Sequence, residues 1–220
     1  MSRLAGWKLA LAAVMVAPAL AQAQFSTSPV HVELSTGYSD TVGNTANYLQ
    51  GGYMVGLGVV VAPAALRPFD LRFSVNYSQY NATIALLNNG QAATGQQVDN
   101  GTGSIVSGTA DARYHFPIVY GVRGYALAGV GAYHTRIELD QALPVYGGYG
   151  YGYGYGYGYG YGYPEAVVAS HGVTNFGWDA GAGVEFALPS GSSWFLEARY
   201  QHVNSKGTVE YVPIEVGFRF

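Results

Sequence analysis

The sequence has no cysteine and few charged residues, and each shortage excludes a class of protein. Without cysteine there is neither a disulfide framework nor an N-terminal cysteine that could carry a lipid anchor. Charged residues make up 10% of the chain, against about a quarter in an ordinary soluble domain. A surface with so few charges is poorly suited to water.

Long apolar runs are also missing. Beyond the N-terminal leader, no stretch approaches the ~20 consecutive apolar residues of a transmembrane helix. The formal net charge of −3 and the lack of a basic run argue against nucleic acid as a partner. Aromatic residues and glycine are abundant instead, with 20 Tyr and 32 Gly. Few charges, many aromatics and no apolar helix are typical of a β-barrel that faces lipid.

The N-terminal residues have the three parts of a secretory signal peptide. Arg3 and Lys8 supply the positive start, residues 9–17 form a short apolar core, and residues 21–23 (AQA) form a small-x-small cleavage site. An uncleaved membrane anchor is the alternative, but the apolar core is short for a spanning helix. The sequence therefore predicts a cleaved signal peptide at residues 1–23 and a barrel domain at residues 24–220.

Apolar and polar residues alternate in the rest of the chain. Phe69, Leu71 and Phe73 alternate with Asp70 and Arg72, so an extended strand here has one apolar face and one polar face. We expect the apolar face to contact lipid and the polar face to line the lumen. In the fifth strand, which is rich in glycine on both faces, the parity is ambiguous. The predicted strands cover residues 30–38, 51–62, 69–78, 105–116, 122–137, 176–188, 194–203 and 211–220.

Short turns and long loops alternate between these strands. The short turns cover residues 63–68, 117–121 and 189–193, and the longer polar loops cover residues 39–48, 81–103, 138–175 and 204–210. Short periplasmic turns and long extracellular loops are the layout of small outer-membrane barrels. The predicted fold is all-β, an eight-stranded antiparallel up-and-down transmembrane β-barrel.

The chain ends on an aromatic strand, YVPIEVGFRF, at residues 211–220. Together with the segments GWDAGAGVEF and FLEARYQHV, this strand resembles the Gram-negative outer-membrane β-barrel domain family that includes OmpA-type, OmpX-type and opacity-type proteins. In that family the barrel-assembly machinery reads the terminal aromatics, which here are Phe218 and Phe220. The resemblance implies the outer membrane of a Gram-negative bacterium as the location. It also implies outer-membrane lipid and lipopolysaccharide as surroundings, and we expect a monomer.

The polar strand faces carry charges of both signs. Buried charges must be paired because an isolated one is too costly, and an eight-stranded barrel is narrow enough for side chains to fill it. We therefore predict a lumenal ion-pair network, with a small carboxylate-lined conducting path as the alternative. The predicted members are Glu33, Arg72, Asp111, Arg113, Glu185, Glu197, Arg199, Glu215 and Arg219, and Asp70 and Asp179 share their parity.

An unbroken alternation of Tyr and Gly occupies residues 149–163, inside the predicted extracellular loop at about 138–175. No aliphatic residue is present to build a core, so we expect a flexible segment or a loose ribbon. Tyr supplies contact area at low entropic cost in binding loops, which favours a host, glycan or cell-surface ligand. A repeat expansion tolerated in an exposed loop is the alternative. The predicted contact residues are Tyr149, Tyr151, Tyr153, Tyr155, Tyr157, Tyr159, Tyr161 and Tyr163.

An enzymatic alternative centres on His202. Residues 198–205 resemble the catalytic neighbourhood of lipid A 3-O-deacylases, eight-stranded barrels with a His-x-Ser pair and a later Glu. The hydroxyl here comes one residue late, at Ser205, and a one-residue offset puts a side chain on the opposite strand face. Glu215 or Glu210 would be the third catalytic residue of such a hydrolase.

No cofactor or metal site is predicted, because the histidines other than His202 show no metal-ligand spacing; they are His31, His115, His134 and His171. The sequence favours a structural or surface-interaction role, like that of an adhesin, over the hydrolase.

Overall fold

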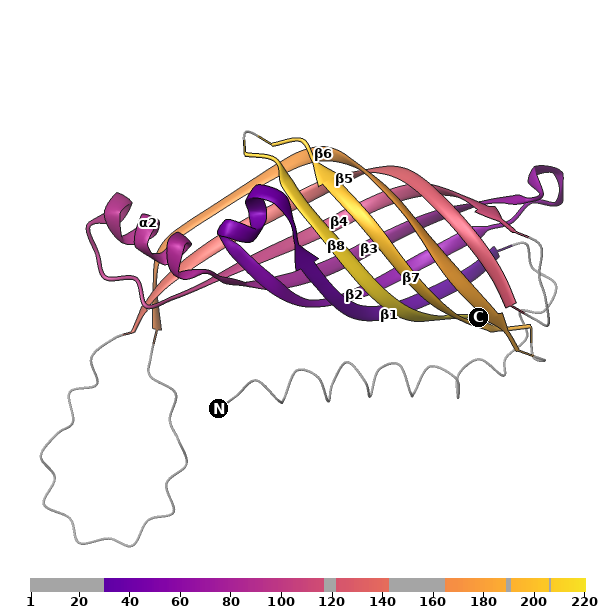
Figure 1. The fold of residues 1–220 in the computed structure, drawn as a ribbon, viewed down its shortest axis with the longest axis horizontal. Coiled ribbons are helices and arrows are strands. Elements are labelled where there is room, and N and C mark those ends of the chain that lie inside the picture. The colour runs from indigo at the N-terminus through magenta and orange to yellow at the C-terminus, as the bar shows by residue number, and fades with distance from the viewer. Residues whose placement is uncertain (1–29, 117–121, 143–164, 189–190, 206) are drawn as a thin grey trace, which may run out of the picture.

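The computed structural model describes residues 30–116, 122–142, 165–188, 191–205 and 207–220, so the predicted signal peptide and the Tyr–Gly run lie outside the described residues. Each strand pairs antiparallel with the next, and β8 pairs with β1 to close a barrel (Figure 1). The predicted fold class is confirmed. The strands are β1 (Val30–Thr41), β2 (Leu49–Val61), β3 (Phe69–Ala82), β4 (Asn100–His115), β5 (Val122–Ala142), β6 (Glu165–Ala187), β7 (Ser193–Val203) and β8 (Val209–Arg219).

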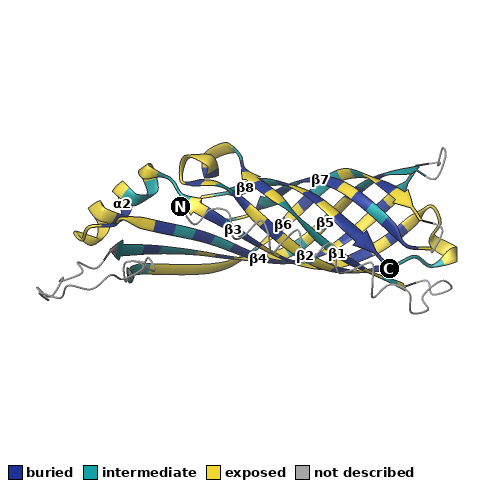
Figure 2. Ribbon diagram, turned by 90° about the horizontal axis from the view of Figure 1, so that it is seen from below, coloured by how far each residue is buried: buried dark blue, intermediate teal, exposed yellow. Residues whose placement is uncertain are grey.

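The wall separates an apolar exterior from a polar interior. In β3, exposed Phe73 and Val75 alternate with buried Arg72 and Ser74, because successive strand side chains point to opposite faces. Figure 2 shows the resulting alternation of exposed and buried residues along the strands. In β5 the odd-numbered residues face inward, so that buried Tyr125 lies in the lumen.

One end of the barrel carries the short connections and the carboxyl terminus (Figure 1). A 3-10 turn, η2 (Ala64–Leu66), joins β2 to β3 there. At the same end, the backbone N–H of Phe220 donates to the carbonyl of Val32 at 2.9 Å. None of the helices among the described residues is long and apolar enough to span a bilayer. We call the end with η2 and the carboxyl terminus the turn end. We call the opposite end, where the short η1 (Gly43–Asn47) joins β1 to β2, the loop end.

At the loop end the strands do not stop at one level. The last β6–β7 pair is Gly177–Val203, whereas β5 and β6 remain paired as far as Ala142 and Glu165. We call residues 132–142 of β5 and 165–176 of β6 the outer extension. Most of it was predicted to be loop, and for residues 138–142 and 165–175 that prediction is wrong. Backbone pairing continues there after the alternation of apolar residues has ended.

A helix, α2 (Ile84–Thr94), packs against the outer extension, where the sequence predicted only loop for residues 81–103; that prediction is also wrong. Thr83 caps its N-terminus by accepting from the N–H of Leu86 at 3.3 Å, and Gly95 ends it with a φ of 69°. A side chain at Gly90 would overlap Leu139 of β5, so the glycine lets the helix lie close to the strand.

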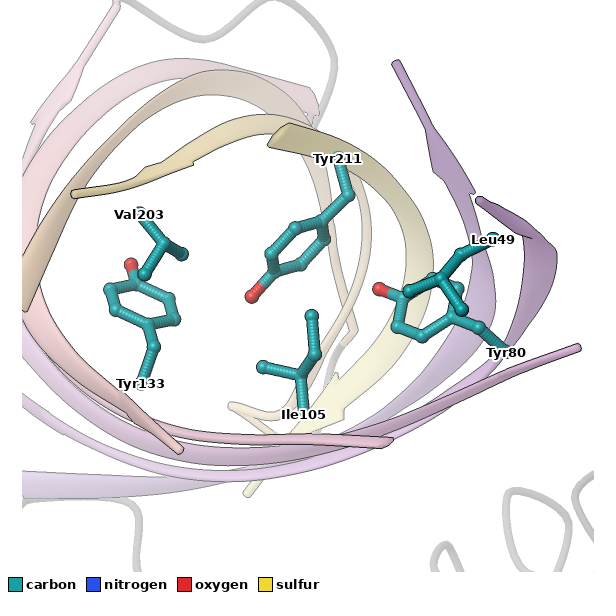
Figure 3. Packing of buried hydrophobic residues seen from close by; sticks show 6 residues of the cluster. All are labelled: Leu49, Tyr80, Ile105, Tyr133, Val203 and Tyr211. Carbon is teal, nitrogen blue, oxygen red and sulfur yellow. The ribbon is translucent and has the colours of Figure 1, made fainter. Parts of the chain in front are cut away.

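Toward the loop end, aromatic and aliphatic side chains project into the lumen (Figure 3). We call this cluster the apolar plug. Its only polar atoms are phenol oxygens, one of which, on Tyr80, shares a hydrogen bond of 2.7 Å with Ser39 Oγ. The plug consists of Leu49, Tyr80, Ile105, Tyr133, Val203 and Tyr211, all buried.

Candidate functional site

Between the apolar plug and the turn end, charged side chains occupy the lumen in two connected groups. We call the one nearer the turn end the turn-end group and the one nearer the plug the loop-end group. The turn-end group centres on Arg113, which donates to Asp70 Oδ1 at 2.7 Å and to Glu33 Oε1 at 2.8 Å. Arg219 donates to the same Glu33 oxygen at 2.8 Å and to Glu185 Oε1 at 2.9 Å. Four strands, β1, β3, β4 and β6, and the end of β8 are thereby tied together inside the barrel.

The loop-end group centres on Arg72 and Arg199. Arg72 crosses the lumen from β3 and binds both oxygens of Glu197 on β7, each at 3.0 Å, while its Nε donates to Asp111 at 2.9 Å. Arg199 donates to Glu215 Oε1 at 2.6 Å. All nine residues predicted to form a lumenal network therefore face inward and make ion pairs. Some of these pairs join neighbouring strands, as Arg199 and Glu215 do, and others cross the lumen, as Arg72 and Glu197 do.

Several lumenal side chains were not anticipated from the sequence. Arg123 lies opposite Glu185 in the β5–β6 register, and His115 Nε2 lies 2.7 Å from Asp70 Oδ2. The phenol of Tyr125 donates to Glu197 Oε2 at 2.6 Å. Strand parity in the sequence could have placed these side chains in the lumen, but the glycines of β5 obscured that parity for Arg123 and Tyr125.

His202 lies on the outer face of β7, near the loop end. Its Nδ1 is 3.3 Å from Glu210 Oε1, and that same oxygen accepts from the phenol of Tyr200 at 2.7 Å. The indole of Trp178 stacks on the imidazole, with ring centres 5.4 Å apart and planes inclined by 22°. This arrangement holds the imidazole ring against β6 and β8.

The structure brings His202 together with Glu210 but not with the other two residues of the hydrolase alternative. Glu215 points into the lumen, where it binds Arg199. The hydroxyl of Ser205 accepts from the backbone N–H of Gly207 at 3.3 Å. Parity explains the result, because Glu215 and His202 lie on opposite faces of the wall.

The terminal aromatics pack in a row on the outside of the turn end. The ring of Phe218 lies 4.9 Å, centre to centre, from both Trp194 and Phe220, edge to face in each case. The carbonyl of Phe220 lies 3.0 Å from Nδ1 of His31. Their role as an assembly signal stays a prediction.

The outer extension combines an unpaired strand edge with exposed side chains. Val167 is 61% exposed and Phe176 79%. Arg136 pairs with Glu138 on its surface at 2.5 Å. The predicted Tyr contacts at residues 149–163 lie outside the described residues. In the part of the chain that the structure describes, no three His, Cys, Asp or Glu side chains are grouped as metal ligands.

The sequence matches no protein-family model and no curated protein. Among solved structures, Neisserial surface protein A is 17% identical to this chain, with a TM-score of 0.52 over 87% of this chain and 96% of that one. The Yersinia pestis attachment invasion locus protein Ail, in complex with the heparin analogue sucrose octasulfate, is 14% identical, with a TM-score of 0.44 over 87% and 99%. The N-terminal β-barrel domain of Pseudomonas aeruginosa OprF is 15% identical, with a TM-score of 0.41 over 86% and 97%.

At these identities the likeness concerns the fold. An eight-stranded barrel is common to this chain and to Neisserial surface protein A. This chain has the fold of the small eight-stranded outer-membrane β-barrels.

Proposed function

We propose that the protein is a monomeric barrel of the Gram-negative outer membrane that makes contacts outside the cell through its loop end. The apolar exterior supports this location: exposed Leu57, Phe73 and Val75 form part of a wall that suits lipid and not water. The filled lumen supports a structural wall with surface contacts more than a pore. Outer-membrane lipid, lipopolysaccharide and the barrel-assembly machinery are the partners of the wall.

The observation that carries the proposed contacts is the unpaired edge of the outer extension. Residues 165–175 of β6 pair with β5 on one side and have no strand partner on the other within the described chain. From Ala166 to Phe176 this edge has no charged residue and no proline, the two devices that commonly keep a strand edge from pairing. An extended peptide can add to such an edge by main-chain hydrogen bonds.

The Tyr–Gly run joins the two strands of the outer extension, because it lies between the end of β5 and the start of β6. We propose that its rings add contact area for a protein, glycan or cell-surface ligand. The barrel wall does not need this segment, since every strand is paired in the wall without it.

Deletion of residues 148–163 tests this proposal. Cells that display the full or shortened protein are compared for binding to host cells, extracellular matrix and immobilised glycans, and folding is monitored by heat-modifiable mobility on gels. We expect unchanged folding and reduced binding. Unchanged binding with unchanged folding would contradict the role of the Tyr–Gly run and favour a tolerated repeat.

The contact between His202 and Glu210 supports a second candidate, a lipid A deacylase on the outer wall. A carboxylate beside an imidazole is part of the arrangement that activates a hydroxyl nucleophile. Mass spectrometry of lipid A from cells with the wild-type protein, His202→Ala or no protein decides this question. An acyl chain removed only by the wild-type protein would establish the enzyme, and identical spectra would exclude this reaction.

A further inference from the structure

The two lumenal charge groups are not equally balanced. The turn-end group has three carboxylates, Glu33, Asp70 and Glu185, and the three guanidinium groups Arg113, Arg123 and Arg219 face them. The loop-end group has four carboxylates and only the guanidinium groups of Arg72 and Arg199. Its carboxylates are Asp111, Asp179, Glu197 and Glu215.

Asp179 is the carboxylate of this group that has no arginine partner. It is 1% exposed, and among the described residues no Arg, Lys or His lies within ion-pair distance of it, whereas each of the other six inward carboxylates pairs with an arginine. Its Oδ2 accepts a long hydrogen bond of 3.3 Å from Tyr133, and its buried Oδ1 has no partner. An uncompensated buried carboxylate is costly, so a counter-charge is expected beside it.

Two further unpartnered oxygens lie at the same level of the barrel. The strand register places Asp111, Gly129, Asp179 and Gln201 side by side on β4, β5, β6 and β7. Asp111 Oδ1 leans over Gly129, where a side chain would overlap it, and is thereby directed toward β6. Gln201, 2% exposed and directly opposite Asp179, has a buried Oε1 without a hydrogen bond. Directly opposed side chains on neighbouring antiparallel strands lie about 5 Å apart at Cβ.

These three oxygens lie between two barriers. Along β7, Gln201 is two residues from Val203 of the apolar plug and two residues from Arg199 of the charge network. Along β6, Gly177 is the next inward position from Asp179 toward the loop end, and it faces the ring of Tyr133. A group bound here would be sealed from both ends of the barrel and would enter while the barrel folds.

We infer that the lumen holds one hard divalent cation, of the Ca²⁺ or Mg²⁺ class, bound by Asp179 Oδ1, Asp111 Oδ1 and Gln201 Oε1. All three ligands are oxygens, and carboxylate with amide oxygen is the ligand set that these cations prefer, with water completing the coordination. The charge balance agrees, because a divalent ion offsets the two excess negative charges of the loop-end group. The cation would then tie β6 to β4 and β7 at a level where arginines link β4 and β7 but not β6.

Metal analysis of the folded, full-length mature protein tests this inference. The protein is purified in detergent from outer membranes, dialysed against EDTA and measured by inductively coupled plasma mass spectrometry. We expect about one divalent cation per chain in the wild type and in the control Asp99→Asn, whose carboxylate lies in the exposed segment before β4. Asp179→Asn, which keeps the side-chain shape, is expected to contain none.

Refolding from urea gives a second readout that does not depend on retained metal. The wild type refolded with Ca²⁺ or Mg²⁺ should melt roughly 5 °C higher than the wild type refolded with EDTA. Asp179→Asn should melt at the same temperature after refolding with Ca²⁺, Mg²⁺ or EDTA. If Asp179→Asn fails to fold, Gln201→Met, which removes only the amide oxygen, should show a smaller metal-dependent shift than the wild type. A wild-type protein without metal that melts identically in Ca²⁺, Mg²⁺ and EDTA would overturn the inference and leave a proton as the counter-charge of Asp179.

Discussion

β6 passes through two environments, and its two parts are built differently. Residues 177–187 pair with β5 and β7. Their inward positions include Asp179, Glu185 and two glycines, Gly177 and Gly183, that lie against the rings of tyrosines on β5. Residues 165–175 pair with β5 alone, and this end of the strand exposes side chains on both faces, including His171 and the adjoining Phe176. In the wall, both faces of the strand stabilise the barrel. In the outer extension, the backbone holds the strand in place and leaves its side chains free for contacts.

The largest effect should follow from breaking the network inside the wall. Arg113→Leu leaves Asp70 and Glu33 short of a buried partner, so we expect the free energy of unfolding to fall by about 3–5 kcal/mol. Arg136→Leu is the matched control, since Arg136 is 53% exposed in its side chain and pairs with Glu138 on the outer extension. Its loss should cost at most about 1 kcal/mol. Urea unfolding in lipid vesicles measures both, and equal losses would contradict the contrast between the two regions.

A charge on the lipid-facing side of β6 should have the next largest effect on stability. Val184 lies on the outer face of β6, opposite Leu196 of β7. Val184→Lys should destabilise the barrel by about 2–4 kcal/mol if the residue lies near the bilayer midplane. Val184→Leu is the control and should unfold at nearly the wild-type urea concentration. A silent lysine would mean that lipid does not cover this face.

Loss of the terminal aromatic should affect assembly more than final stability. Phe220 packs on Phe218, and its backbone closes on Val32 and His31 of β1. Deleting Phe220 should slow insertion into the outer membrane, while the barrel that does fold should lose only about 1 kcal/mol of unfolding free energy. Pulse-labelling followed by heat-modifiability gels measures the rate, and wild-type kinetics would refute an assembly role.

The sequence was most informative where lipid imposes a pattern. In the wall, one strand face must be apolar and the other polar, so the period of two identified the strands other than β5, whose glycines obscured it, and the inward side of Arg72 or Glu197. Beyond the wall, lipid no longer imposes an apolar face and the alternation disappears, although β5 and β6 remain paired and Leu139 packs against α2. The predicted β5 therefore ended too early, at Ile137, and the predicted β6 began too late, at Phe176. α2 was missed even though Thr83 and Gly95 are ordinary helix-capping residues.

Partners across the lumen were harder to infer than the residues that face it. Asp111 and Arg113 are two residues apart on one strand face, and so are Glu197 and Arg199. Glu197 does lie 2.9 Å from Nε of Arg199, but Asp111 pairs with Arg72 at 2.8 Å and Arg113 binds Asp70. Such contacts depend on how the barrel closes, which strand pairing alone does not specify. The same limitation affected the hydrolase alternative, since only the register of β7 and β8 showed that Glu210 faces His202.

The smallest effect on stability should come from a lysine in the part of β6 that lies outside the wall. Val167 is 61% exposed and pairs only with Asp140 of β5, so Val167→Lys buries no charge. Its unfolding free energy should stay within about 0.5 kcal/mol of the wild type, although the substitution is the same as at Val184. A lysine on an edge strand does oppose the addition of another strand. Val167→Lys should therefore weaken binding of cells to whatever surface the wild type binds, while Val167→Thr, which remains uncharged and β-branched, should bind normally. If cells with Val167→Lys bound normally and Val184→Lys left the free energy of unfolding unchanged, the two parts of β6 would not differ in function.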